Sequence, residues 1–76
     1  MKIKKYMKKI IILAGNFEQF KNYVDSQDRN HQDFVYCSSI EAILGIDAEK
    51  IITVGTFWNR QDAGKLKDFA DSRIRE

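Results

Sequence analysis

The chain has 76 residues, of which 43% are hydrophobic and 32% are charged, and its single cysteine is Cys37. This length suits one small domain, the hydrophobic content excludes a disordered protein, and one cysteine excludes an internal disulfide. A fold without disulfides suits a reducing compartment, and we expect the cytoplasm. No apolar run approaches the ~20 residues of a membrane helix, so no membrane association is expected.

The basic residues are distributed unevenly along the chain. Residues 1–9 contain five lysines and no acidic residue, whereas the remainder contains 8 basic and 11 acidic residues. A nucleic-acid-binding domain usually carries a basic stripe on its folded surface, so nucleic acid is not expected as a partner. We predict a basic N-terminal arm over 1–7, as a solubilising lead-in or a phosphate contact, and a single domain over 8–76. Met7 is a second candidate for the start of the protein.

The first hydrophobic run, at residues 10–13, shows no alternation, which is typical of a strand buried on both faces. It predicts a strand over 8–13. Asn16 follows as a helix N-cap, and Gln19 three positions later completes a capping box. A polar loop is expected over 26–32. The apolar stripe of the intervening helix is predicted to comprise Phe17, Phe20 and Val24.

The second hydrophobic run predicts a strand over 33–37. Ser38 and Glu41 have the spacing of a second capping box, which predicts a short second helix. Gly45 is expected to end this helix in the left-handed conformation. The apolar residues of the short helix are Ile40, Ile43 and Leu44.

The third hydrophobic run predicts a strand over 50–54, followed by a loop over 55–60. A third helix is expected to begin near residues 59–61. Its predicted buried face consists of Ala63, Leu66, Phe69, Ala70 and Ile74.

Three strands that alternate with three helices favour an α/β fold with parallel pairing, because parallel strands need crossover connections. The most apolar strand, the first, is expected at the centre. This gives a small three-stranded parallel sheet of order 2-1-3, a Rossmann-like βαβαβα arrangement with right-handed crossovers. The first and second helices then lie on opposite faces. Because the second helix is short, its face is completed either by the arm and the third helix, or by a partner or a second copy of the chain.

The sequence shows no reaction motif. It lacks the glycine fingerprint of dinucleotide sites and the Gly-Lys-Ser/Thr of phosphate loops. Glu18, Glu41 and Asp62 fall in the first turns of predicted helices, where helix capping explains them. His31 and Cys37 lie at opposite ends of a predicted strand, roughly 15–20 Å apart, so they cannot form a catalytic pair. We therefore predict no catalytic residue, metal or cofactor.

The loop after the third strand carries the only tryptophan, Trp58, next to Phe57. One of these adjacent rings can fold under the third helix, but both cannot easily point inward. An exposed Trp near an Arg has the composition of a protein-interface hot spot. The alternatives are that both rings cover the sheet, that the loop stacks on a base, or that Arg60 and Asp62 simply pair with each other. Because parallel strand ends share one edge, the predicted binding residues are Asn16, Tyr36, Phe57, Trp58, Asn59, Arg60 and Asp62.

The same loop carries a resemblance. The residues that carry it are Val54, Gly55, Thr56, Phe57, Trp58, Arg60, Asp62 and Ala63 in the loop, and Tyr36, Leu44 and Gly45 upstream. Together they resemble a family of small bacteriophage proteins with a βαβαβα pattern. The likeness covers residues 8–73 and is most specific over 54–63. This chain has Gln61 where the family often has proline, so the start of the following helix is less fixed. The resemblance implies a phage accessory protein of the bacterial cytoplasm and brings no known activity.

We therefore expect a small non-enzymatic protein that binds a host or phage macromolecule, most simply a protein, and one form of this role is inhibition of that protein. The alternative is a domain that binds a small ligand or nucleotide at the same sheet edge. In that case the N-terminus of the first helix would hold an anion.

Overall fold

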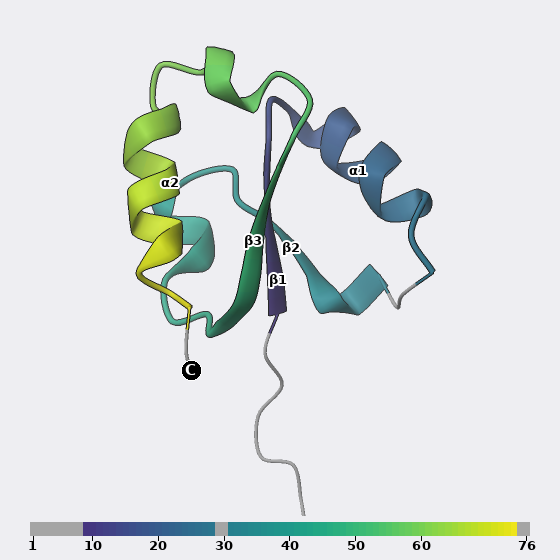
Figure 1. Cartoon of the computed structure of the whole chain (residues 1–76), viewed down its shortest axis with the longest axis horizontal. Coiled ribbons are helices and arrows are strands. Elements are labelled where there is room, and N and C mark those ends of the chain that lie inside the picture. Colours follow the sequence, from purple (N-terminus) through teal and green to yellow (C-terminus); the bar gives the residue numbers. More distant parts are fainter. Residues whose placement is uncertain (1–8, 29–30, 75–76) are drawn as a thin grey trace, which may run out of the picture.

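The computed structural model describes residues 9–28 and 31–74, so the predicted arm over 1–7 lies outside the described residues. The three strands form one parallel sheet in the order β2-β1-β3, which confirms the predicted pairing and strand order (Figure 1). No helix in the described part of the chain is long and apolar enough to span a membrane. The strands and α-helices are β1 (Lys9–Ala14), α1 (Phe17–Asp25), β2 (Phe34–Tyr36), β3 (Ala48–Val54) and α2 (Ala63–Asp71).

The described residues contain two α-helices, so the prediction of three is wrong. The expected second helix is a 3-10 turn, η2 (Ile40–Ile43), and Ser39 precedes it without a side-chain capping bond. Its buried Ile43 lies three residues after Ile40, a spacing that brings the two side chains to one side of a 3-10 turn. The backbone is already extended at Leu44, which is exposed, and Gly45 then takes the predicted left-handed conformation with φ +79°.

The third predicted helix begins later than expected. A separate 3-10 turn, η3 (Phe57–Asn59), follows β3, and α2 starts at Ala63. Arg60 separates the two elements because its backbone is extended, with φ −73° and ψ 146°. The buried face of α2 is Ala63, Leu66 and Ala70, as predicted. Phe69, also predicted there, is only partly buried against the same cluster, and Ile74 lies beyond the helix and is exposed.

The strand bounds also differ from prediction, and β1 ends at Ala14, one residue later than expected. β2 is only three residues long, because a further 3-10 turn, η1 (His31–Asp33), precedes it. β3 starts two residues before the predicted position, and a register shift between Lys9 and Ile10 lets Ala48 pair with Lys9. Such irregularities depend on the partner strand and leave no local signal in the sequence.

The core lies on both faces of β1, which confirms that this strand is buried on both sides. α1 covers one face, where Val24 packs with Ile10 and Ile12. α2 and the turns η2 and η3 cover the other face, so the short η2 does not cover it alone (Figure 1). On that second face the buried side chains are Ile11, Leu13, Cys37, Ile43, Ala48, Phe57, Ala63, Leu66 and Ala70.

Candidate binding edge

The carboxyl ends of the three parallel strands meet at one edge, which is the upper end of the sheet in Figure 1. The segments that follow these ends are the start of α1, the loop after β2 and residues 55–62, which contain the turn η3. All seven predicted binding residues lie in these segments or at the strand ends, because the sheet is parallel as expected. The structure nevertheless gives them different roles.

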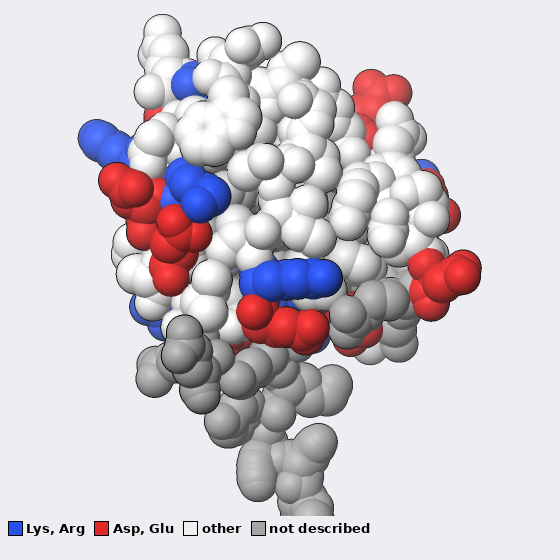
Figure 2. Space-filling model, in the orientation of Figure 1, with Lys and Arg blue, Asp and Glu red and all other residues white. Residues whose placement is uncertain are grey.

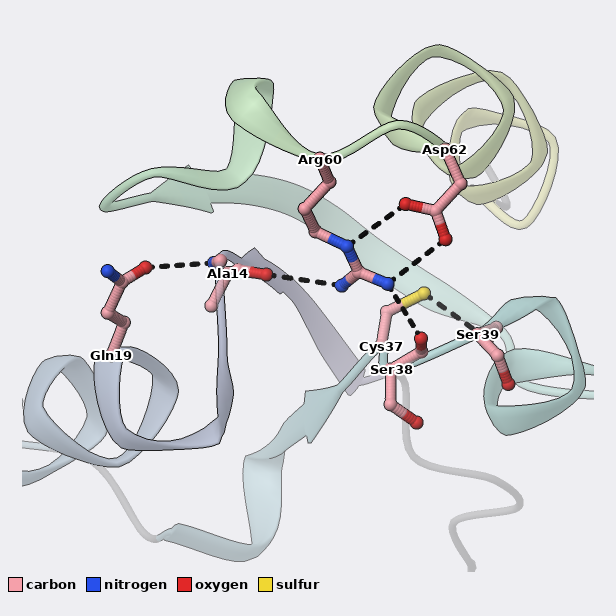
Figure 3. Close-up of polar contacts among 8 residues, drawn as sticks. Ala14, Gln19, Cys37, Ser38, Ser39, Arg60 and Asp62 are labelled. Atoms are coloured by element: carbon pink, nitrogen blue, oxygen red, sulfur yellow. Dashed lines mark hydrogen bonds and ion pairs between the residues drawn. The ribbon is translucent and has the colours of Figure 1, made fainter.

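Arg60 holds the three strand ends together (Figure 3). Its Nη1 donates to the Ala14 carbonyl at 3.3 Å, its Nη2 donates to the Ser38 carbonyl at 2.9 Å, and both Nε and Nη2 donate to the Asp62 carboxylate at 3.0 Å. The Arg60 side chain is 21% exposed. The guanidinium fork is therefore occupied by internal bonds, and the predicted alternative that Arg60 pairs with Asp62 is confirmed.

A second set of bonds joins the loop after β1 to the loop after β3. Gln19 Oε1 accepts from the backbone N–H of Gly15 at 2.9 Å and of Thr56 at 3.0 Å. Asn16 caps α1 as predicted, since its Oδ1 accepts from the Gln19 N–H at 2.9 Å. Gln19 does not complete a capping box but bonds across 37 residues to Thr56, a contact that helix-start rules do not predict. The amides of Gly15, Gln19 and Thr56 at this edge are thus already bonded to side chains and do not point freely at an anion.

Two glycines allow this close approach. A Cβ at Gly15 would collide with Thr56 Oγ1, and a Cβ at Gly55 would collide with Gln19 Oε1. Gly55 also has a φ of +60°, in the left-handed region that favours glycine.

These glycines allow a matched test of the Gln19 contact. Gly45→Ala introduces only backbone strain, because nothing lies within 4 Å of the added Cβ, and we expect it to lower the free energy of unfolding by about 1–2 kcal/mol. Gly55→Ala also displaces Gln19, so we expect a loss of about 2–4 kcal/mol. Gly64→Ala lies within α2 in open space and should raise stability by about 0.5–1 kcal/mol. Urea unfolding measures all three, and equal losses at Gly45 and Gly55 would contradict the contact.

Phe57 and Trp58 face different environments although they are adjacent. The Phe57 side chain is fully buried in the core, whereas Trp58 is 58% exposed. Their ring centroids lie 5.1 Å apart at an angle of 69°, so the buried ring supports the exposed one. Phe57 therefore belongs to the core and is not accessible at this edge, while Trp58 is.

Tyr36 lies in an aromatic cluster that the sequence did not reveal. Its ring centroid is 5.6 Å from that of Phe17 and 5.2 Å from that of Phe20, and these two phenylalanines are 5.6 Å apart. Phe17 was predicted to be part of a buried stripe but is 57% exposed. The reason is its position as the first residue of α1, where the helix has only just left the sheet edge. The Asn16 cap was the signal that places Phe17 there.

The remaining candidates have minor or internal positions. Asn59 is exposed at the end of η3, and Asp62 is the partner of Arg60. Cys37 is buried, its Sγ lies 3.5 Å from the Ser39 carbonyl, and burial raises the pKa of its thiol, against the opposing effect of the Arg60 guanidinium. This thiol is thus a core group. Among residues 9–28 and 31–74, no group of three or more His, Cys, Asp or Glu residues is placed to hold a metal ion.

An open hollow of about 330 Å³ runs along α1. It was not predicted from the sequence, and Arg60 is not among its lining residues. The residues that line it are Phe17, Phe20, Lys21, Val24, Asp25 and His31.

Comparison with known proteins adds no relative. No protein family, no curated protein and no solved structure matches the chain.

Proposed function

We propose that this domain is a non-enzymatic binding protein that docks on another protein through the C-terminal edge of its sheet, with Trp58 as the anchor. The observation that carries this proposal is the contrast within one turn, in which Phe57 is fully buried and Trp58 is 58% exposed. Contiguous exposed apolar patches on soluble proteins mark contact surfaces, and tryptophan is among the residues enriched in interface hot spots.

The surroundings of Trp58 support docking because they are held in place. Arg60 links the segments after all three strands, and Gln19 links Gly15 to Thr56. Loops that are already ordered lose little conformational entropy on binding, which favours affinity. Phe17 and Tyr36 add apolar area beside this edge, and the exposed Asn16 and Asn59 supply polar groups for its rim.

The resemblance of residues 54–63 to small bacteriophage proteins gives this proposal a concrete form. The chain would be a phage accessory protein that docks on a host or phage protein in the bacterial cytoplasm, and inhibition of that protein is one consequence of docking. The alternative of an anion or nucleotide at the N-terminus of α1 has less support, because the Gly15 and Gln19 amides there are bonded to the side chains of Gln19 and Asn16.

The test compares two residues of equal exposure at different places in the fold. Trp58 lies at the C-terminal edge, whereas Leu44, also 58% exposed, follows η2 on the return to the start of β3. We expect Trp58→Ala to weaken partner binding at least about 30-fold, the effect of removing a hot spot, and Leu44→Ala to leave it nearly unchanged.

The measurement is affinity capture from bacterial lysate with wild type and both variants, followed by titration of each captured protein. A protein counts as the partner only if the Trp58 variant loses it and the Leu44 variant retains it. Both variants should remain folded by circular dichroism, because both side chains are largely exposed. A captured protein that the two variants bind equally would contradict docking through Trp58.

A further inference from the structure

The outer edge of β3 carries a feature that the docking of Trp58 does not use. Natural edge strands are usually short, charged, interrupted by proline or covered by other segments. β2, at the other edge of the sheet, has only three residues. β3 has seven, and within residues 9–28 and 31–74 its outer side is paired only at its start, where the Ala48 N–H donates to the Arg73 carbonyl at 2.9 Å and Ala48 bridges to Ile74. Residues 51–54 contain no charge and no proline, and no described strand pairs with their outer side.

The register shows which backbone groups point outward. The Ile12 carbonyl accepts from the Cys37 N–H at 3.1 Å, so the backbone N–H and C=O of Ile12 point toward β2. Those of its neighbour Ile11 therefore point toward β3. Ile11 lies opposite Ile51, and in a parallel ladder a residue bonds to the residues on either side of its opposite. The N–H and C=O groups of Ile51, and of Thr53 two residues later, therefore point away from β1.

The surface around these groups is largely uncharged (Figure 2). Figure 1 looks onto this edge, with β3 in front of β1 and with α1 and α2 to either side. In the same orientation, Figure 2 shows uncharged surface over the middle and upper part of this face, with charged side chains below and to the sides. An extended backbone can bond to a whole row of outward N–H and C=O groups, so a β-strand is the occupant that fits this edge.

We propose that the occupant is a second copy of this chain, which pairs antiparallel, β3 to β3, about a two-fold axis at Ile52. In this register Ile51 exchanges two hydrogen bonds with the partner's Thr53, and Thr53 does the same with the partner's Ile51. Every outward group of the two residues is then bonded. Lys50 lies opposite the partner's Val54, so no like charges face each other directly. The pairing ends before Ala48, where Arg73 and Ile74 already lie.

The edge favours its own copy because it is self-complementary. Ile51 and Thr53, whose backbone groups point outward, lie two positions apart. One two-fold axis at Ile52 therefore pairs each of them with the other residue in the second copy and joins the two sheets into a continuous six-stranded sheet. This inference is independent of the proposed docking through Trp58, since it uses only the backbone of β3.

The first test is the oligomeric state of the full chain by analytical ultracentrifugation. We expect the dimer fraction to rise with concentration between about 10 µM and 1 mM, as a small contact predicts. Thr53→Pro removes an N–H that no bond within the sheet uses, so the monomer should remain folded while the dimer Kd rises at least about tenfold. Thr53→Val keeps this N–H and should leave the dimer intact. A monomer at every concentration, or a dimer that persists with proline at position 53, would overturn the proposal.

A second test checks the register. In a Cys37→Ala background, Ile52→Cys places two thiols directly opposite each other and should give a disulfide-linked dimer under mild oxidation. Lys50→Cys places the two thiols four residues out of register and should give far less disulfide-linked dimer. Equal cross-linking would overturn the register, and the Thr53 variants still decide the pairing if Ile52→Cys does not fold. If a synthetic peptide of residues 49–55 binds the chain while the chain itself stays monomeric, the edge receives a strand from another protein instead.

Discussion

Phe57→Ala is expected to lower the free energy of unfolding by about 3–5 kcal/mol, the range for removing a buried aromatic side chain. Phe57 is among the largest fully buried side chains and lies in the cluster between β1 and α2. A domain of this length has a total stability of roughly 4–11 kcal/mol, so the change removes a large part of it. Urea unfolding followed by far-UV circular dichroism measures the loss.

The neighbouring tryptophan supplies the matched control. Trp58→Ala removes a larger ring, yet we expect a loss of less than about 1 kcal/mol because Trp58 is 58% exposed. Phe57→Leu keeps most of the buried volume and should fall between the two. Similar losses at positions 57 and 58 would mean that both rings cover the sheet, which was one interpretation of the sequence. The docking proposal would then lose its anchor.

The sheet could be predicted from the sequence because its signals are local. Residues 10–13 carry four large apolar side chains without alternation, which is typical of a strand buried on both faces. Alternation with helical segments then required parallel pairing and placed three loops at one edge. The same reasoning placed Trp58 at that edge, but it could not decide which of the two adjacent rings is buried. That choice depends on the direction in which η3 leaves β3.

The second helix was predicted wrongly because its signals were weak ones. Ser38 and Glu41 have the spacing of a capping box, but the turn begins one residue later and Ser39 makes no side-chain cap. A segment of four residues offers too few backbone bonds to favour an α-helix. Burial of Ile43 under α2 is enough to hold it as a 3-10 turn.

The roles of Arg60 and Gln19 could not be predicted because their partners lie far away in the sequence. Arg60 bonds to carbonyls 46 and 22 residues away, and Gln19 bonds to an amide 37 residues away. In the sequence, Arg60 is a polar residue close to a tryptophan that was expected to be exposed. That description fits an arginine that is free to contact a partner and an arginine that bonds internally equally well. Only the fold distinguishes these two roles.

Arg60→Ala should therefore act on stability, with an expected loss of about 2–4 kcal/mol. The buried Ala14 carbonyl would lose its Arg60 donor, and the link from the Ser38 carbonyl to the loop after β3 would be broken. The pair with Asp62 contributes less, because the Asp62 side chain is 44% exposed and water competes for it. Urea unfolding of the variant measures the sum of these effects.

Two further variants separate the clamp from a simple charge effect. Asp62→Ala leaves both carbonyl bonds in place, so we expect it to cost about 1 kcal/mol or less. Arg60→Lys keeps the charge but not the planar fork, and a single ammonium cannot reach the ends of β1 and β2 in the same way, so most of the loss should remain. If Arg60→Ala leaves stability unchanged, the three strand ends are held by packing alone. The ordered edge around Trp58 would then need another physical cause.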